Sequence, residues 1–354
     1  MNNESPARLM VIGVGGGGGN AVDRMMRAGL QGVELVAVNT DVQVLARVQA
    51  HRHLQIGAKL TRGLGAGGDP EVGRMAAEES REDIADLLTG LDMVFITAGM
   101  GGGTGTGAAP VIAETAQELG ILTVGIVTRP FSFEGITRAQ RAEVGIENLA
   151  KHVDALVTIS NDKLLKVAPP DMPLTRAFEL VDEVLRQGVQ GITDLITVPG
   201  LINLDFADVE SVLKGAGTAM MGIGEAEGEN KTREAARRAI SSPLLDANVK
   251  GAKKAILNIV GGENLTLEEV TEAAGVIQEA LADKADLIFG ATIHEGMQQV
   301  RVTVIATGFP AKPGEGVAES EEEAILERIE REGVVRDDYD VPTFLRKAHR
   351  AELP

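Results

Sequence analysis

The chain has 354 residues, of which 44% are hydrophobic and only 3% aromatic, and its formal net charge is −18. This length allows two domains with aliphatic cores, whereas the charge disfavours nucleic-acid binding, which needs a basic face to displace counterions. There is no cysteine, which excludes disulfides, a thiolate nucleophile and a cysteine-based metal site and is consistent with a cytoplasmic protein.

No segment has the properties of a signal peptide or a membrane span. The first residues, MNNESPARLM, lack a basic stretch followed by an apolar one. The longest uncharged stretch, residues 93–113, contains six glycines and Pro110, which is typical of a strand, a loop and the start of a helix. We therefore expect a soluble protein that does not insert directly into a membrane.

Short aliphatic runs alternate with helical patterns in the first half of the chain. Their uncharged centres are typical of strands buried on both faces of a parallel sheet. The runs are Leu9–Gly13, Val33–Asn39, Asp92–Ala98, Ile121–Thr128 and Ala155–Ser160. One helix is predicted from the cap sequence Asp69-Pro70-Glu71 to Gly90, and another from Thr106 to Leu119. This alternation predicts a Rossmann-like, doubly wound α/β domain with a parallel sheet.

A long helix and a second, smaller α/β domain are predicted next. Apolar residues keep helical spacing from Leu174 to Ile196. Beyond this helix we expect helices at Thr232–Ile240 and Leu267–Ala282 and strands at Ala255–Val260, Leu287–Ile293 and Gln299–Ala306. Thr266 and Glu269 have the spacing of a capping box at the start of the second of these helices.

The C-terminal residues have the composition of a flexible acidic tail. Residues 315–340 hold eleven acids and three bases with few aliphatic side chains, which is typical of a solvated linker. The last residues, VPTFLRKAHRAELP, place Val341, Phe344 and Leu345 beside Arg346 and Lys347. We expect a short partner-binding peptide there.

The first of two glycine-rich loops reads VIGVGGGGGN at residues 11–20. Gly13, Gly15 and Gly18 satisfy the G-x-G-x-x-G pattern between a predicted strand and a predicted helix. Asp41 ends the next strand, where dinucleotide enzymes place a ribose-binding acid. One hypothesis is therefore an NAD-dependent oxidoreductase. Another is that these glycines only allow close packing of helix and strand.

The second loop reads MGGGTGTGAAP at residues 100–110 and is not a P-loop, because no Gly-Lys-Ser/Thr follows. Its backbone N–H groups can converge on an anion, the following helix adds positive potential, and Thr104 and Thr106 can add hydroxyl donors. Two such loops at neighbouring strand ends would hold a nucleotide from both sides, whereas one dinucleotide pyrophosphate needs only one.

GGGTGTG resembles the signature of the tubulin/FtsZ superfamily of GTPases, and the resemblance is strongest to its bacterial cell-division branch. Family motifs occur in order over about residues 8–310: VGGGGGNAV, AVNTD, GLGAGGDPEVG, AGMGGGTGTGAAP, PFSFEG, NDKLL, NLDFADV and ISSPLL. VPTFLRK also resembles the C-terminal peptide of the family. The resemblance implies a GTP-hydrolysing protein that assembles head to tail into filaments of the cytokinetic ring, at the division site beneath the membrane.

The resemblance also implies which residues bind GTP and GDP. Phosphate-binding positions are matched by Gly16, Gly17, Gly18, Gly101, Gly102, Gly103, Thr104, Gly105, Thr106 and Gly107, guanine-contacting positions by Asn20, Asn161, Phe178 and Asp182, and the ribose and phosphate region by Glu134 and Arg138. Phe178 and Asp182 are four residues apart on the long helix and therefore share a face. A carboxylate there accepts from the ring N–H and the 2-amino group of guanine, two donors that adenine does not present. We expect Mg²⁺ to bind mainly through the nucleotide phosphates, because the five histidines form no metal-ligand pattern.

No general base is evident beside either glycine loop. The informative acids are Asp205 and Asp208, near Asn203 in NLDFADV, since two carboxylates can orient a water and receive its proton. The preceding helix, at ~1.5 Å per residue, places them some ~30 Å from its beginning. The resemblance implies that this loop completes the nucleotide site of the next subunit, so that hydrolysis requires assembly. A nucleotide-binding structural protein without turnover is a further alternative, which the intact Asp205 and Asp208 disfavour.

These patterns predict five regions. They are a GTP-binding domain at 1–173, a central helix at 174–198, a second α/β domain at 199–312, an acidic linker at 313–340 and a peptide at 341–354. The peptide is expected to bind membrane-tether and regulatory division proteins.

Overall fold

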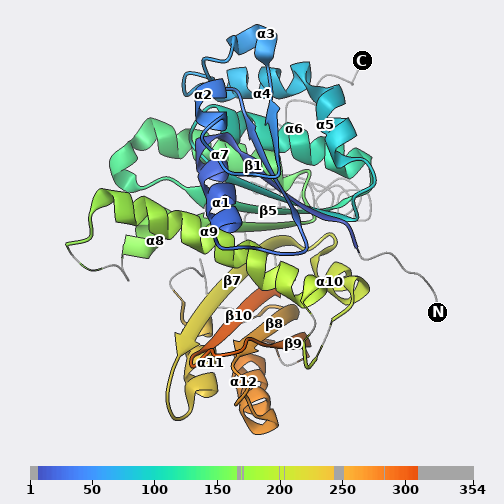
Figure 1. Ribbon diagram of the computed structural model, residues 1–354, viewed down its shortest axis with the longest axis vertical. Coiled ribbons are helices and arrows are strands. Elements are labelled where there is room, and N and C mark those ends of the chain that lie inside the picture. The colour runs from blue at the N-terminus through green and yellow to red at the C-terminus, as the bar shows by residue number, and fades with distance from the viewer. Residues whose placement is uncertain are drawn as a thin grey trace, which may run out of the picture. The chain divides into compact units, whose positions relative to one another are not determined.

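A computed structural model of the protein describes residues 7–165, 169, 171–198, 200–202, 204–242, 251–282 and 284–309 (Figure 1). The strands are β1 (Leu9–Val14), β2 (Glu34–Asn39), β3 (Arg52–Gln55), β4 (Met93–Gly99), β5 (Leu122–Arg129), β6 (Ala155–Ser160), β7 (Gly217–Ala226), β8 (Lys254–Gly261), β9 (Asp286–Ile293) and β10 (Val300–Thr307). The helices are α1 (Gly15–Arg27), α2 (Val42–Leu45), α3 (Ala58–Thr61), α4 (Pro70–Glu79), α5 (Arg81–Leu88), α6 (Thr104–Glu118), α7 (Ile136–Ala150), α8 (Asn161–Leu165), α9 (Leu174–Thr197), α10 (Phe206–Leu213), α11 (Lys231–Ile240) and α12 (Leu267–Ala280), with a 3-10 turn, η1 (Ser132–Glu134).

The strands follow the order β3-β2-β1-β4-β5-β6-β7-β10-β8-β9. Strands β1 to β6 pair in parallel with their neighbours, and β7 continues this parallel pairing with β6. On its other side β7 pairs antiparallel with β10. The predicted doubly wound α/β fold with a parallel sheet is therefore confirmed.

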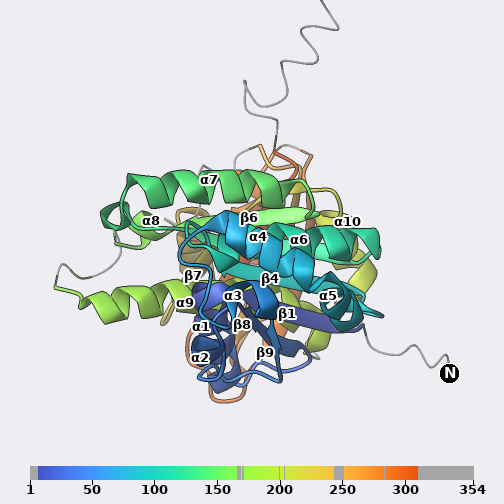
Figure 2. The same cartoon turned by 90° about the horizontal axis from the view of Figure 1, so that it is seen from above.

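The parallel strands are buried on both faces, as their aliphatic runs indicated. Leu9 and Val11 of β1 belong to a core shared with α1 and α9, whereas Met10 and Ile12 belong to a core shared with α4, α5, α6 and α7. Figure 2 shows these two sets of helices on opposite faces of the sheet. Because each helix follows a strand of this sheet, the loops that begin α1 and α6 come to the same edge.

Helix α9 is the predicted long helix, and it has 24 residues. At ~1.5 Å per residue it is about 36 Å long. It contacts α1 and β5 of the parallel sheet layer and also β8, β9 and α10. In Figure 1 it runs from α8 at one end to α10 at the other. The two ends of this helix therefore carry different parts of the predicted site.

Several elements differ from the sequence-based predictions. The helix predicted from residue 70 to Gly90 is two helices, α4 and α5, which meet at Ser80. The Ser80 hydroxyl accepts a hydrogen bond from the Gly57 N–H at 3.1 Å, a tertiary contact. Strand β7 was not predicted, because its glycines obscure the apolar pattern. A β-carbon added to Gly222 would lie 2.0 Å from the Ala239 oxygen of α11.

The predicted domain boundaries stay predictions. The chain up to Phe309 forms one compact unit, and β7 joins the parallel strands to the antiparallel ones within it. The predicted linker, the C-terminal peptide and Asn203 lie outside the described residues. Among the helices that are described, none combines the length and the hydrophobicity needed to cross a membrane.

Candidate nucleotide-binding site

The two glycine-rich loops touch each other at the carboxyl ends of the adjacent strands β1 and β4. A β-carbon added to Gly15 would lie 2.8 Å from the Gly105 nitrogen, and one added to Gly17 would lie 3.2 Å from the Gly99 nitrogen. Gly15 also has a φ of +72°, which favours glycine. Glycine is therefore required for contact at these positions, and the two loops form one continuous backbone surface.

Gly16 and Gly102 face open space on this surface. A β-carbon added to either residue would have no neighbouring atom within 4 Å. Gly16 lies in the first turn of α1 and Gly102 lies just before α6, helices of 13 and 15 residues, whose N-termini contribute free N–H groups and positive potential. Two helix N-termini beside open glycine backbone can bind a phosphate chain without a lysine.

The loop at residues 65–69 packs behind the second glycine loop. A β-carbon added to Gly103 would lie 2.8 Å from the Ala66 β-carbon and 3.0 Å from the Asp69 nitrogen. Arg141 of α7 donates from Nη1 to the Gly68 oxygen at 2.8 Å. Asp69 caps α4 by accepting from the Glu71 N–H at 3.0 Å, as its sequence context indicated. These contacts connect the loop at residues 65–69 to the second glycine-rich segment and to α7.

Both threonine hydroxyls of the second loop make internal hydrogen bonds. Thr104 Oγ1 lies 2.7 Å from Thr40 Oγ1, and Thr106 Oγ1 accepts from the Gly101 N–H at 2.8 Å. All three threonines are buried. These hydroxyls fix the loop conformation, and their expected donation to a ligand stays a prediction.

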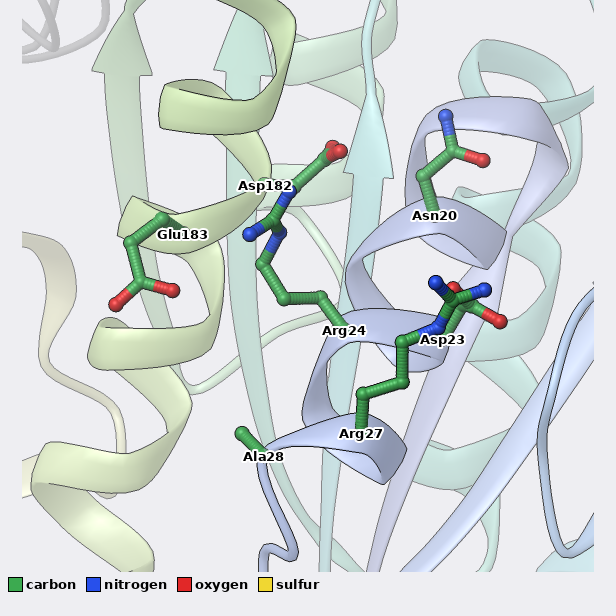
Figure 3. A pocket seen from close by; sticks show the side chains of 7 residues that line it. All are labelled: Asn20, Asp23, Arg24, Arg27, Ala28, Asp182 and Glu183. Atoms are coloured by element: carbon green, nitrogen blue, oxygen red, sulfur yellow. The ribbon is translucent and has the colours of Figure 1, made fainter. Parts of the chain in front are cut away.

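A cavity of about 420 Å³ lies between α1 and α9, and Figure 3 shows its lining. The residues that line it are Asn20, Asp23, Arg24, Arg27, Ala28, Asp182 and Glu183. Two of the predicted guanine contacts, Asn20 and Asp182, therefore come together across the two helices. The cavity residue Asn20 lies four residues, about one helical turn, after Gly16 on α1.

Burial raises the pKa of Asp182 to about 6, while Arg24 opposes this rise and the acidic Glu179 and Asp23 add to it. The Asp182 side chain is thus mostly ionised at neutral pH. An ionised carboxylate offers only acceptors, which suits the paired donors of guanine. Asp182, which its spacing from Phe178 on the long helix indicated, is therefore ionised at neutral pH, as the predicted hydrogen bonds to guanine require.

The other predicted base contacts lie at the start of α8 and on the first turns of α9. Phe178 is 40% exposed, and its ring packs edge-on against Phe131 with ring centroids 5.5 Å apart. Phe131 in turn stacks on Phe133. Asn161 is 5% exposed, and its Oδ1 atom is buried without a hydrogen-bond partner. A buried unpaired amide oxygen is expected to gain a partner from a ligand or a water.

Glu134 and Arg138 form an ion pair of 3.1 Å beside the second glycine loop. Glu134 also accepts from the Phe131 N–H at 2.8 Å. A β-carbon added to Gly101 would lie 2.6 Å from the Arg138 oxygen, so the start of α7 packs directly on the loop. Both residues therefore lie next to the surface formed by the two glycine-rich segments.

Asp205 and Asp208 form a reciprocal capping box at the start of α10. The Asp208 N–H donates to Asp205 Oδ1 at 2.8 Å, and the Asp205 N–H donates to Asp208 Oδ2 at 3.2 Å. The full length of α9 separates these carboxylates from the end of that helix that carries Phe178. Within one chain, the structure does not bring the predicted catalytic acids to the predicted nucleotide pocket.

Sequence reasoning did not assign roles to several residues that organise the site. Asp162 binds both the backbone N–H and the hydroxyl of Ser132, at 2.9 and 2.5 Å, and so ties the Glu134 loop to α8. The motifs that contain these residues were recognised, but their mutual contact spans 30 positions. Arg24 is four residues after Asn20 on α1, a spacing that could have indicated a shared face. Among the described residues there is no group of three or more His, Asp or Glu side chains able to hold a metal.

Comparison with known proteins gives matches over most of the chain. Residues 8–169 match the Tubulin/FtsZ family, GTPase domain, and residues 217–310 match the FtsZ family, C-terminal domain. The FtsZ dimer of M. jannaschii is similar at 48% identity and a TM-score of 0.83, with 86% of this chain and 89% of that chain covered. A single-residue variant of that FtsZ is similar at 48% identity and a TM-score of 0.84, covering 86% and 92%. CetZ2 from Haloferax volcanii shares the fold at 23% identity and a TM-score of 0.75, covering 92% and 99%.

The alternative of an NAD-dependent oxidoreductase is not supported. The family matched by the first half of the chain is a GTPase family. Asp41, expected in that alternative to bind a ribose, instead caps α2, where Oδ1 accepts from the Gln43 and Val44 N–H groups at 2.9 and 3.1 Å. The G-x-G-x-x-G pattern does not by itself distinguish the nucleotide, and phosphate binding by this loop stays a prediction.

Proposed function

This chain belongs to the Tubulin/FtsZ family and is a tubulin-like, filament-forming GTPase of cell division. We propose that each active site is formed by two subunits, one that binds the nucleotide and a neighbour that supplies the catalytic acids. The glycine surface and the α1–α9 cavity bind guanine nucleotide, and the acids at the start of α10 hydrolyse the nucleotide of the neighbouring subunit. The observation that supports this division is the length of α9: Asp182 lies 15 residues before the last residue of the helix, Thr197, which corresponds to a rise of about 22 Å before the chain reaches α10.

The proposed phosphate contacts are the backbone N–H groups around Gly16–Gly18 and Gly101–Gly107, with the Glu134–Arg138 pair beside the ribose and phosphates. The open backbone of Gly16 and Gly102 supports this assignment. Mg²⁺ would bind mainly to the phosphate oxygens, which are the hard ligands it prefers. It would neutralise charge as the terminal phosphate leaves.

The proposed base contacts are Asn20, Asn161, Phe178 and Asp182. Asp182→Asn is expected to abolish the preference for GTP over ATP, because an amide presents its own donors to those of guanine. The same change should stabilise the nucleotide-free protein at pH 7.5 by about 1–2 kcal/mol, since each pKa unit is worth about 1.4 kcal/mol. Binding isotherms for GTP and ATP, together with chemical unfolding of the nucleotide-free protein, measure both effects.

The pH dependence of this stability term has a definite sign. The pKa of Asp182 is about 6 in the folded chain and about 3.9 in an unfolded one. Between these values only the folded state holds the proton, so this term loses stability as pH rises from about 4 to about 6. The stabilising effect of Asp182→Asn should consequently vanish near pH 4. A constant effect from pH 4 to pH 8 would show that burial of this charge is not its origin.

Hydrolysis completed by a neighbour predicts that specific GTPase activity rises with protein concentration. Assembly is a self-association of identical chains, for which head-to-tail contacts that do not close give open filaments. The measurement is the rate of phosphate release per subunit across a concentration series that spans the onset of light scattering. A rate per subunit that is the same below and above that onset would contradict a site shared between subunits.

We propose that the filaments form the cytokinetic ring at the division site, and that the peptide at residues 341–354 binds membrane-tether and regulatory proteins there. Its support is the sequence alone: three apolar residues beside two bases at the end of an acidic stretch. Three apolar side chains bury too little surface for stable membrane insertion, which favours a protein partner.

A further inference from the structure

Arg24 is a cationic side chain in the α1–α9 cavity that none of the roles above uses. It lines the cavity together with Asn20 and Asp182. Its Nε atom is buried and has no hydrogen-bond partner. By contrast Arg27, one turn further along α1, forms an ion pair with Asp23 at 2.8 Å. Leaving a guanidinium nitrogen buried and unpaired costs free energy, so its retention beside the proposed base site calls for a function.

The charged groups that act on Asp182 come from the two helices that face the cavity. Arg24 and Asp23 belong to α1, and Glu179 belongs to α9. Arg27 of α1 and Glu183 of α9 line the same cavity, and Arg24 also helps to lower the pKa of Glu183. Burial is the main cause that raises the Asp182 pKa, Arg24 is the one cation that opposes it among the described residues, and the two acids reinforce it. In Figure 3 the Arg24 side chain extends from α1 toward the Asp182 carboxylate.

Arg24 interacts electrostatically with the Asp182 carboxylate but is not hydrogen-bonded to it. In the part of the chain that the structure describes, the two side chains form no hydrogen bond or direct ion pair, and their interaction is a Coulomb attraction through the cavity. A direct ion pair would use the carboxylate oxygens that guanine needs. A guanidinium at longer range favours the ionised form and leaves both oxygens free for a ligand.

Building on the proposed guanine site, we propose that Arg24 is a positioning residue for base recognition that keeps Asp182 ionised and available in the nucleotide-free subunit. A protonated Asp182 would present a donor to the donors of guanine and lose one acceptor. Without Arg24, the buried acid between Asp23 and Glu179 would be protonated over part of the neutral pH range. Arg24 therefore sets the lower pH limit of guanine binding.

The test is the pH dependence of GDP affinity for the full chain, comparing Arg24→Met with the unchanged protein from pH 5.5 to pH 8. Loss of a nearby opposite charge shifts a carboxyl pKa by about one unit or more. For a shift of about one unit, the variant should bind GDP about fivefold more weakly than the unchanged protein at pH 6 and about equally at pH 8. Titration of the GDP phosphates is common to both proteins and cancels in the ratio of dissociation constants.

Two further variants separate charge from packing. Arg24→Lys keeps the charge and should restore most of the affinity at pH 6. Arg233→Met removes a cation that pairs with Glu272 at 2.9 Å and does not line the cavity, and its affinity ratio should not change with pH. If Arg24→Met is poorly folded by circular dichroism, Arg24→Gln replaces it with a side chain of similar length.

Two outcomes would overturn the proposed role of Arg24, and a third would overturn the guanine site on which it rests. A loss of affinity by the same factor at every pH would overturn the proposal and assign Arg24 a structural role. An equal pH-dependent loss in Arg233→Met would overturn it as well, because the effect would then not be specific to Arg24. If the unchanged protein does not prefer GDP to ADP at pH 7.5, the guanine site itself fails, which this design distinguishes from failure of Arg24 alone.

Discussion

Asp208→Asn is expected to bind GTP with nearly unchanged affinity and to lose at least about 100-fold in turnover, the scale of a lost general acid–base group. The amide can still accept from the Asp205 N–H, so the capping box of α10 is preserved. What the change removes is the negative charge that would orient the attacking water and receive its proton. Equilibrium binding of GTP and single-turnover hydrolysis above the assembly threshold measure the two quantities.

The matched control uses the second capping box of the chain. Thr266 Oγ1 accepts from the Glu269 N–H at 3.2 Å, and Glu269 Oε2 accepts from the Thr266 N–H at 2.9 Å at the start of α12. Glu269→Gln alters that box in the same chemical way, remote from any proposed site residue, and should hydrolyse GTP at the normal rate. Full activity in Asp208→Asn would remove Asp208 from the catalytic residues.

Mixing two inactive variants tests whether the acid acts on the neighbouring subunit. Subunits with Asp208→Asn still supply nucleotide pockets, and subunits unable to bind nucleotide still supply Asp208. A mixture should therefore regain hydrolysis at the junctions where an intact acid loop meets an intact pocket. A mixture that is inactive although light scattering shows co-assembly would argue against a shared site.

Gly16→Ala and Gly102→Ala are expected to weaken GTP binding by about 100-fold, or about 2.7 kcal/mol, while leaving folding stability within about 0.5 kcal/mol. The added β-carbon at either position has no neighbouring atom within 4 Å in the protein, so the fold accommodates it. The space that it enters is the space proposed for the phosphates. GTP isotherms and urea unfolding of the nucleotide-free variants measure the two effects.

Two other glycines serve as controls with opposite expectations. At Gly275 in α12 an added β-carbon also meets no atom within 4 Å. Gly275→Ala should leave GTP affinity unchanged and raise folding stability by about 1 kcal/mol, because alanine favours a helix interior more than glycine does. Gly107→Ala would place a β-carbon 1.9 Å from the Pro70 oxygen, and it should destabilise the fold by about 3 kcal/mol or more. Normal GTP affinity in both Gly16→Ala and Gly102→Ala would refute the assignment of this surface to phosphate.

Features that depend on near neighbours in the chain could be predicted from the amino-acid sequence. The buried strand β1, the cap of α4 at Asp69 and the capping box at Thr266 follow from residues within a few positions of one another, because hydrogen bonds and side-chain periodicity inside an element are local. The two glycine loops were also recognisable, since only glycine permits the approach of Gly15 to Gly105.

The tertiary structure alone decided the features that depend on contacts between distant segments. The break at Ser80 comes from a hydrogen bond to Gly57, and β7 is a strand because β6 and β10 flank it. The role of Asp41 as a cap rather than a ribose ligand, and the unpaired Arg24 beside Asp182, likewise needed the packed chain. Burial and electrostatic environment are sums over neighbours from many segments, so no short stretch of sequence contains them.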